Sequence, residues 1–316
     1  MITSSHFTQP ANSQHIDAGV NDGAYVSLAQ LQQLRHTAKQ YLAASGKSNA
    51  PLNGQHQSRA VSRGMEFEDV RPYQAGDDIR SIDWRVTART QVTHSKRYAE
   101  EKEKPIVTVV DQRRSSFFGS HPCFKSVYSC QLAALVNWAT LAAGDRSGGI
   151  VLGGEHISET RPARSHKTVN RWLQQLSTAN QQLSATTADN LSMSDCLKRV
   201  IHTTQTGTDI VLISDCYDLD EECEKQLFYL SRHHRITLLW VVDQLEMALP
   251  HTAQITVSDG HASRQLPLQR SLTHQFNQYH QAKEAALQQL CQRLRIRLIK
   301  APVQNPVHEI AMGVMR

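Results

Sequence analysis

Long apolar segments are missing from this sequence. The longest apolar runs, such as Ile236 to Val242, are far shorter than the roughly 20 residues that span a bilayer. The N-terminal residues also lack the basic start and the apolar stretch of a secretory signal. We therefore expect a cytoplasmic protein without direct membrane insertion, whose contact with the inner membrane, where there is one, is peripheral and made through partners.

Paired cysteines are missing too. The six cysteines include no C-x-x-C pair, and most of them lie in apolar surroundings: Cys123, Cys130, Cys196, Cys216, Cys223 and Cys291. Such spacing does not support a zinc site or a disulfide framework. Free, buried thiols in a reducing compartment are the expectation.

The most highly charged region of the sequence lacks a clear excess of basic residues over acidic ones. The formal net charge is +5, yet between Arg59 and Lys104 ten basic residues alternate closely with nine acidic ones. A surface that follows phosphates needs cations that neighbouring acids do not neutralise. Nucleic acid is therefore not an expected partner, and binding through the basic C-terminal stretch remains the weakest alternative: Arg293, Arg295, Arg297 and Lys300.

The N-terminal third divides into four parts. Residues 1–25 are polar and have little apolar periodicity, which is typical of a flexible tail. From Ser27 to Ala44 apolar residues recur at helical spacing, and Ser27 is placed to cap an amphipathic helix. Small polar residues over 46–58 then indicate a linker, and the charged segment described below completes the region 26–104.

From Pro105 onward, strand patterns alternate with helical ones. Apolar runs without alternation, each followed by a helical stretch, indicate a parallel sheet that is covered on both faces. The expected strands are PIVTVVD, GGIVLGG, DIVLISD, ITLLWVVD and IRLIK, and the expected helices cover residues 124–143, 167–176, 193–203, 219–233 and 268–294. The sequence thus predicts a doubly wound α/β domain over residues 105–303, followed by a C-terminal tail over 304–316.

Three of the expected strands end in aspartate, namely Asp111, Asp215 and Asp243. In open α/β sheets ligands bind beyond the carboxyl ends of the strands, so these carboxylates are candidate site residues, with hydroxyls from Ser115, Ser116 and Ser214 nearby. Hard oxygen ligands of this kind suit Mg²⁺, Mn²⁺ or Ca²⁺. The alternative is that Asp215, and even more Asp243, is only a helix cap or turn residue.

Two enzyme classes that use this geometry are disfavoured. A phosphotransferase of the haloacid-dehalogenase type needs a second carboxylate two residues after Asp111, where this chain has Arg113. A nucleotide-binding site needs a glycine-rich turn after the first strand, which DQRRSSFFGS does not provide. A Mg²⁺-dependent enzyme acting on a phosphate-containing substrate remains the main alternative to a non-enzymatic protein.

The segment from Ser62 to Arg89 combines glycine, aromatic residues and closely spaced opposite charges. This composition is typical of a compact, irregular piece in which arginines fork to carboxylates. It is either a docking segment that holds the N-terminal region onto the α/β domain or a surface that recognises a partner through tryptophan and arginine. The candidate partner-binding residues are Arg71, Asp77, Asp78, Arg80, Asp83, Trp84 and Arg89.

The order of residues in this segment resembles a known family. From Gly64 to Arg89 the chain reads G-M-E-F-x-D-x-R-x-Y-x-x-G-D-D-x-R-x-I-D-W-x-x-x-A-R, which is similar to the signature of the domain-of-unknown-function-58 proteins. The similarity continues through the strand that ends at Asp111 and covers roughly residues 30 to 300. Its further motifs are FKS at 124–126, GDRSGG at 144–149 and VVDQLEMALP at 241–250.

This resemblance implies a von Willebrand factor A-like, Rossmann-like domain after the signature, in a bacterial protein. It also implies an association with a MoxR-type AAA+ ATPase and with other von Willebrand factor A proteins. The metal-ion-dependent adhesion site of such domains begins with D-x-S-x-S, and this chain has D-Q-R-R-S. Asp111 and Ser115 match that pattern and Asp215 aligns with a later acid, but Arg113 replaces the middle serine.

The replacement matters because a guanidinium opposes a divalent cation and can itself pair with Asp111 or Asp215. The expected site is therefore a degenerate one, formed by Asp111, Ser115 and Asp215, with Mg²⁺ as the one cofactor left open. Taken together, the sequence favours a non-enzymatic interaction or adaptor protein that works with a MoxR-type AAA+ ATPase. The partner would bind at the degenerate site, at the charged signature, or at both.

Overall fold

The computed structural model describes residues 23–45, 65–100, 104–120, 122–249, 254–258, 263–267 and 270–315. Most of the expected tail and the whole expected linker over 46–58 lie outside these residues. The tail was predicted to extend to residue 25, but Ala24 is buried and the Tyr25 hydroxyl donates to the carbonyl of Leu183 at 3.0 Å. The ordered body therefore begins before the predicted helix.

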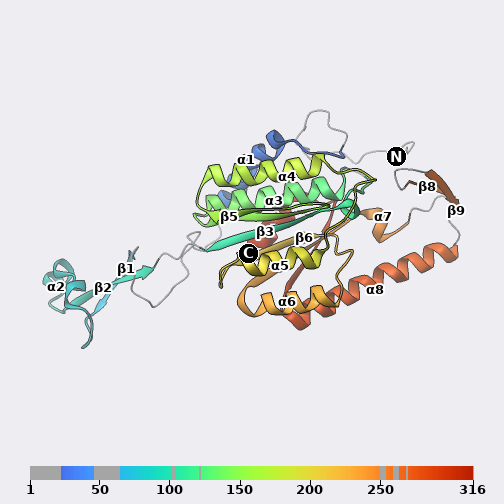
Figure 1. Cartoon of the computed structure of the whole chain (residues 1–316). Helices are drawn as coiled ribbons and strands as arrows, with labels where there is room; N and C mark the ends of the chain where they lie inside the picture. Colours follow the sequence, from blue (N-terminus) through green and yellow to red (C-terminus); the bar gives the residue numbers. More distant parts are fainter. Residues whose placement is uncertain are drawn as a thin grey trace.

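A six-stranded sheet forms the centre of the α/β body (Figure 1). Its order is β10-β7-β6-β3-β4-β5, and all neighbours are parallel except the pair β4–β5. Counted from β3, this is the order 3-2-1-4-5-6 of a doubly wound sheet, so the predicted von Willebrand factor A-like (Rossmann-like) fold class is confirmed. The strands are β3 (Pro105–Gln112), β4 (Arg146–Gly153), β5 (Ile157–Ala163), β6 (Asp209–Ser214), β7 (Arg235–Val242) and β10 (Arg297–Pro302).

The two faces of this sheet carry separate apolar cores because successive strand residues point to opposite sides. In β3, Ile106 and Val110 pack with one group of helices, whereas Val107 and Val109 pack with another. The first group is α1 (Leu28–Ser45), α3 (Lys125–Ala142), α4 (His166–Gln181) and α9 (Val307–Met315). The second is α5 (Met193–Thr203), α6 (Glu221–His233) and α8 (Arg270–Leu294).

Both ends of the chain contribute to the first of these cores. The predicted helix after Ser27 is confirmed, and its cap is reciprocal: Gln30 N donates to Ser27 Oγ, while Ser27 N donates to Gln30 Oε1 at 2.8 Å. The predicted C-terminal tail over 304–316 is wrong. Helix α9 occupies most of it and buries Ala311 against the body, because its apolar residues recur at helical spacing.

Steric constraints explain two of the glycines in the GDRSGG motif, Gly144 and Gly149. Gly144 follows α3 with φ of +91°, a conformation that suits glycine at a helix end. A Cβ on Gly149 would lie 2.4 Å from the ring of Trp172 and 2.6 Å from the carbonyl oxygen of Thr108. Gly149 therefore lets α4 approach the sheet at a distance that no other residue permits.

The signature folds as a unit of its own, which we call the signature unit (residues 65–100). Strands β1 (Met65–Pro72) and β2 (His94–Glu100) form an antiparallel pair, and their connection holds the 3₁₀ turn η1 (Ile79–Ser81) and the helix α2 (Trp84–Thr90). The prediction of an irregular piece is therefore wrong. Figure 1 shows this unit standing apart from the six-stranded sheet.

The remaining elements are the 3₁₀ turn η2 (Arg114–Ser116), the short helix α7 (Gln244–Met247) and the strand pair β8 (Gln254–Ser258) and β9 (Ser263–Pro267). All six cysteines are free thiols, five of them buried and Cys123 half-buried. Within the described residues, no helix has both the length and the apolar character to cross a membrane.

Candidate functional site at the strand ends

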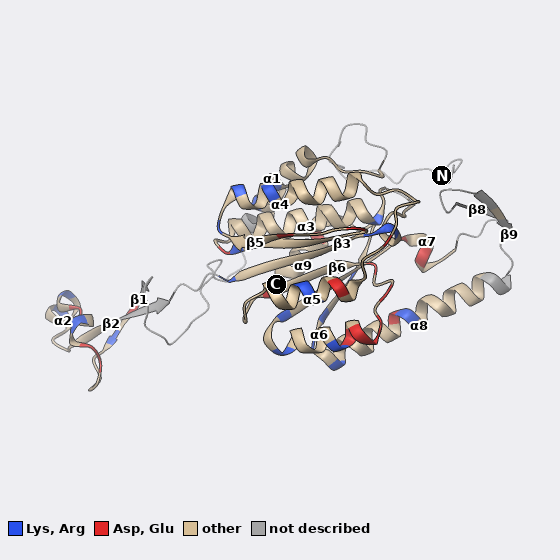
Figure 2. Cartoon of the chain, viewed as in Figure 1, with Lys and Arg blue, Asp and Glu red and all other residues tan. Residues whose placement is uncertain are grey.

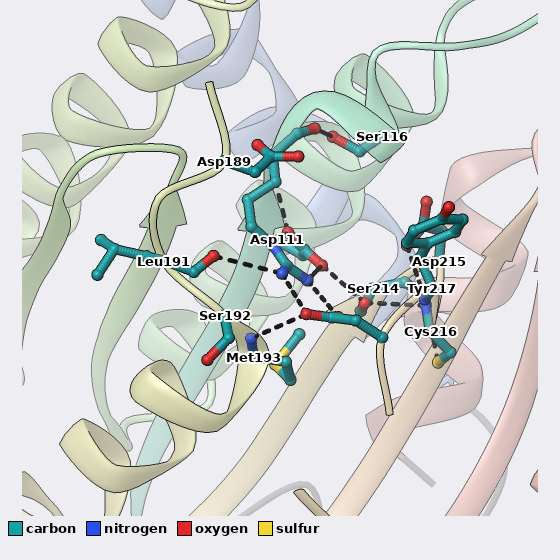
Figure 3. A network of polar contacts seen from close by, with 12 residues as sticks. Asp111, Ser116, Asp189, Leu191, Ser192, Met193, Ser214, Asp215, Cys216 and Tyr217 are labelled. Carbon is teal, nitrogen blue, oxygen red and sulfur yellow. Dashed lines mark hydrogen bonds and ion pairs between the residues drawn. The ribbon is translucent and has the colours of Figure 1, made fainter. Parts of the chain in front are cut away.

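Asp111 and Asp215 lie at the same edge of the sheet. Asp111 is the last residue but one of β3, Asp215 directly follows β6, and these two strands are parallel neighbours. The Ser214 hydroxyl donates to Asp111 Oδ2 at 2.9 Å, so the two strand ends are joined (Figure 3). In a sheet of this order β3 and β6 flank the point where the strand order reverses, which is where ligands of open α/β sheets bind.

Arg113 lies between two carboxylates. Its Nε and Nη2 atoms donate to the two oxygens of Asp111 at 2.9 and 2.8 Å, and Nη1 and Nη2 donate to Asp218 at 2.5 and 2.7 Å. The residue is only 5% exposed. Asp218 also accepts from the backbone N–H of Met193 at the start of α5, so the guanidinium ties β3 to the loop after β6 and to α5.

A second buried cation serves Asp215. Lys125 Nζ lies 3.0 Å from Asp215 Oδ2 and 2.6 Å from Glu246 Oε1, and Lys125 is 2% exposed. Tyr217 N donates to the other oxygen of Asp215, and the Ser115 hydroxyl is also hydrogen-bonded to this carboxyl group. We call the six charged residues of this edge the strand-end site: Asp111, Arg113, Lys125, Asp215, Asp218 and Glu246.

Burial and ion pairing act in opposite directions on the pKa values of Asp111, Asp215, Arg113 and Lys125. Burial acts to raise the pKa of Asp215, but Lys125 outweighs it and holds the pKa of this carboxyl below its usual value. Burial raises the pKa of Asp111, against the opposing effect of Arg113. Burial would lower the pKa of both Arg113 and Lys125, yet their carboxylate partners raise both values. Both bases are therefore fixed cations inside the site.

A divalent cation does not fit these residues as they are arranged. Both oxygens of Asp111 accept from Arg113, and those of Asp215 accept from Tyr217 N and Lys125. A metal would have to displace a buried cation, and an unpaired buried charge is costly. Within the part of the chain that the structure describes, no three His, Cys, Asp or Glu side chains are grouped to hold a metal ion.

The other strand-end residues have structural roles. Asp243 caps α7 in a reciprocal capping box with Glu246, and it also accepts from the backbone N–H and the hydroxyl of Ser120. Asp243 is therefore a helix cap, which the sequence analysis gave as the alternative to a role in the site. The Ser116 hydroxyl donates to the carbonyl of Arg113 at 2.7 Å and closes the turn η2.

Sequence reasoning missed Lys125, Asp218 and Glu246. Lys125 belongs to the FKS motif and Glu246 to VVDQLEMALP, two segments that the resemblance marked without giving them a role. A lysine at the start of a helix after the first strand faces the carboxyl edge of the sheet, so a search for cations near this edge could have found it. Asp218 carries no sequence signal beyond its place in an acidic stretch.

The candidate partner-binding residues of the signature unit divide into two groups. The acids support the local fold: Asp77 pairs with Arg71 at 2.7 Å, Asp78 caps η1, and Asp83 caps α2 through the N–H groups of Arg85 and Val86. The other three, Arg80, Trp84 and Arg89, are exposed.

Residues 69–289 match the family described as "Protein of unknown function DUF58". The chain belongs to this family. It is 27% identical over 234 residues to the uncharacterized protein Mb1516 of Mycobacterium bovis, a match that covers 73% of this chain and 70% of that protein. The uncharacterized protein Rv1480 of Mycobacterium tuberculosis matches with the same figures.

Solved structures similar to this DUF58 protein share little sequence with it. BatB from Bacteroides thetaiotaomicron superposes with a TM-score of 0.40 at 13% identity, covering 67% of this chain and 97% of that one. The SpRpn10 VWA domain superposes with a TM-score of 0.38 at 9% identity, covering 67% and 95%. Because both scores are low, the fold class rests on the strand order of the DUF58 chain itself.

Proposed function

We propose that this DUF58 protein is a non-enzymatic interaction protein that works as an adaptor with an AAA+ ATPase of the MoxR type. The observation that carries the proposal is the internal pairing of the strand-end site. General bases, nucleophiles and metal-bound water act through groups that a substrate can reach. Here Asp111 and Asp215 are 1% and 5% exposed and bonded to Arg113 and Lys125.

We further propose that the strand-end edge contacts its partner without a metal ion. The edge keeps the place of an adhesion site, but its two strand-end carboxylates, Asp111 and Asp215, already pair with cations of the chain itself. Three exposed side chains surround it and are free to make contacts: Arg114 in η2, Phe118 at 40% exposure and Tyr217 at 74% exposure. A tyrosine and an arginine are typical anchors of protein interfaces.

Surface-immobilised protein and a purified MoxR-type ATPase test the adaptor role. The ATPase is loaded with ATP analogue or ADP, and binding is measured by biolayer interferometry. We expect binding in at least one nucleotide state, and weaker binding by Tyr217→Ala, whose side chain is 74% exposed. An absence of binding in both states refutes the adaptor role. Equal binding by wild type and Tyr217→Ala moves the contact away from the strand-end edge.

A further inference from the structure

Three carboxylates of the signature unit, those of Asp77, Asp78 and Asp83, make contacts within the unit itself. The ion pairs that the structure describes there join Arg71 to Asp77 and Lys96 to Asp83, and Asp78 accepts from the N–H of Arg80 as a cap. These contacts leave out the guanidinium groups of three exposed arginines, Arg80, Arg85 and Arg89. Among the described side chains of the signature unit, Asp77, Asp78 and Asp83 thus form no ion pair with these three arginines.

Helix α2 places two of these side chains, Arg85 and Arg89, on one face. Its inner side is formed by Val86 and Thr87, which are half-buried, and the Thr87 hydroxyl accepts from the backbone N–H of His94 in β2. Arg85 and Arg89 are four residues apart and therefore neighbours on the helix surface, beside Trp84. Like charges at this spacing repel each other, so the isolated unit is not stabilised by placing them together.

The apolar part of the same surface is exposed. Trp84 at the start of α2 and Ile79 in η1 are each 67% exposed, although a tryptophan of a folded unit is usually well buried. We call the surface of Trp84, Arg85 and Arg89 the basic-aromatic face. In Figure 2 the blue of Lys and Arg marks part of α2, which lies at the end of the unit away from the six-stranded sheet.

The chemistry of this face favours a protein over a nucleic acid. Tryptophan and arginine are the residues that most often carry binding energy in protein interfaces, and a guanidinium forks to a carboxylate through two parallel hydrogen bonds. A phosphate chain would in contrast pass Asp83, which directly precedes Trp84 and lies two residues before Arg85 in the sequence, and phosphate binding requires cations without such neighbours.

We propose that the basic-aromatic face binds an acidic segment of the partner protein, with Trp84 packed against an apolar side chain and the arginines paired to carboxylates. This inference rests on the proposed function, because the partner tested is the MoxR-type ATPase.

Binding of the ATPase to variants of the full chain tests the face. We expect Trp84→Ala to weaken binding by roughly 30-fold, which corresponds to about 2 kcal/mol, and the double variant Arg85→Glu/Arg89→Glu to abolish it. The matched control is Lys198→Glu/Arg199→Glu, which reverses two exposed cations on α5 of the α/β body and should change affinity by no more than about twofold. Circular dichroism spectra confirm that each variant is folded.

A carbodiimide cross-link identifies the protein that binds the basic-aromatic face. The variant Arg85→Lys keeps the charge and places an amine on the face, and a carbodiimide joins that amine to a carboxylate in contact with it. A cross-link from position 85 to an Asp or Glu of the ATPase supports the proposal. Cross-links only to carboxylates of this chain or of a second copy overturn it, and so does displacement of the ATPase by short duplex DNA at moderate salt.

The two proposals fail differently. If the wild-type chain does not bind the ATPase in either nucleotide state, the adaptor role falls and this inference falls with it. If the wild-type chain binds and the variants of the basic-aromatic face bind equally well, only the inference about this face is refuted.

Discussion

Removal of Arg113 is the sharpest perturbation of the strand-end site. Its guanidinium donates four hydrogen bonds at 2.5–2.9 Å to Asp111 and Asp218. Arg113→Met keeps much of the volume of the side chain but leaves Asp111 buried without its cation. Breaking a buried ion pair by removal of one partner costs about 3–5 kcal/mol, a large part of the 5–15 kcal/mol by which a domain is typically stable.

Urea unfolding at neutral pH, followed by tryptophan fluorescence and circular dichroism, measures this loss. We expect the free energy of unfolding of Arg113→Met to fall by about 4 kcal/mol. The double variant Asp111→Asn/Arg113→Met should recover much of this loss, because the unpaired charge is then gone. The matched control is Arg114→Met, whose exposed side chain neighbours the same turn and should change stability by less than about 0.5 kcal/mol.

The pH dependence gives a second readout with a definite sign. Arg113 acts to lower the pKa of Asp111, which burial raises, so its removal raises the folded-state pKa of Asp111 further. A carboxyl whose pKa is higher in the folded state stabilises the fold at pH below its unfolded value of about 3.9 and loses this contribution as pH rises. The difference in free energy of unfolding between the wild type and Arg113→Met should therefore grow from acidic to neutral pH. A deficit under about 1 kcal/mol, or one that is independent of pH, refutes the assignment of a buried, charged pair.

Three further predictions follow from other contacts. Calorimetry with millimolar Mg²⁺ or Mn²⁺ should detect no binding to the wild-type chain. The variant Arg113→Ser restores the D-x-S-x-S pattern and should gain Mn²⁺ binding. If the wild-type chain binds metal and Asp111→Ala abolishes that binding, the result instead favours the Mg²⁺-dependent enzyme. Gly149→Ala should lower the free energy of unfolding by about 3 kcal/mol, because its Cβ meets the Trp172 ring. Gly313→Ala in α9 should instead stabilise the fold slightly, because its Cβ would make an ordinary contact with Ile299 Cδ1 at 3.9 Å. Equal effects of the two substitutions would contradict the steric explanation. The thiols should react very slowly with Ellman's reagent in the native protein, because burial raises the pKa of Cys291 to about 11 and of Cys223 to about 12, and rapid native reaction would show that they are accessible.

The sequence predicted the main elements of the α/β body because its strands and helices carry strong local patterns. The runs ending at Asp111, Asp215 and Asp243 became β3, β6 and β7, and their parallel pairing follows from the helices between them. A tight turn at Gly153 and Gly154 between two strands was expected, but the bounds of the second strand, β5, were not predicted, because ISETRPA is polar and only partly buried. The hairpin β1–β2 was missed for a related reason, since its charged residues mask the alternation of a strand.

The candidate site could be located from the sequence but its state could not. Strand ends in a doubly wound sheet are always brought to one edge, so the proximity of Asp111 and Asp215 follows from chain order alone. Whether Asp111 and Asp215 are paired with cations depends on side chains from distant segments of the sequence. Lys125 comes from α3, Asp218 from the loop before α6 and Glu246 from α7, and no spacing rule connects these positions.

Arg113 and Lys125 together carry the charge that one divalent cation would bring. Each of them is fixed to two carboxylates, one at a strand end and one outside the sheet, namely Asp218 for Arg113 and Glu246 for Lys125. A bound metal can leave and return with its concentration, whereas these side chains are covalently part of the chain and remain charged near neutral pH. A partner that meets this edge therefore meets a surface of constant charge. If regulation of binding exists, it has to come from elsewhere, such as the nucleotide state of the partner or the signature unit.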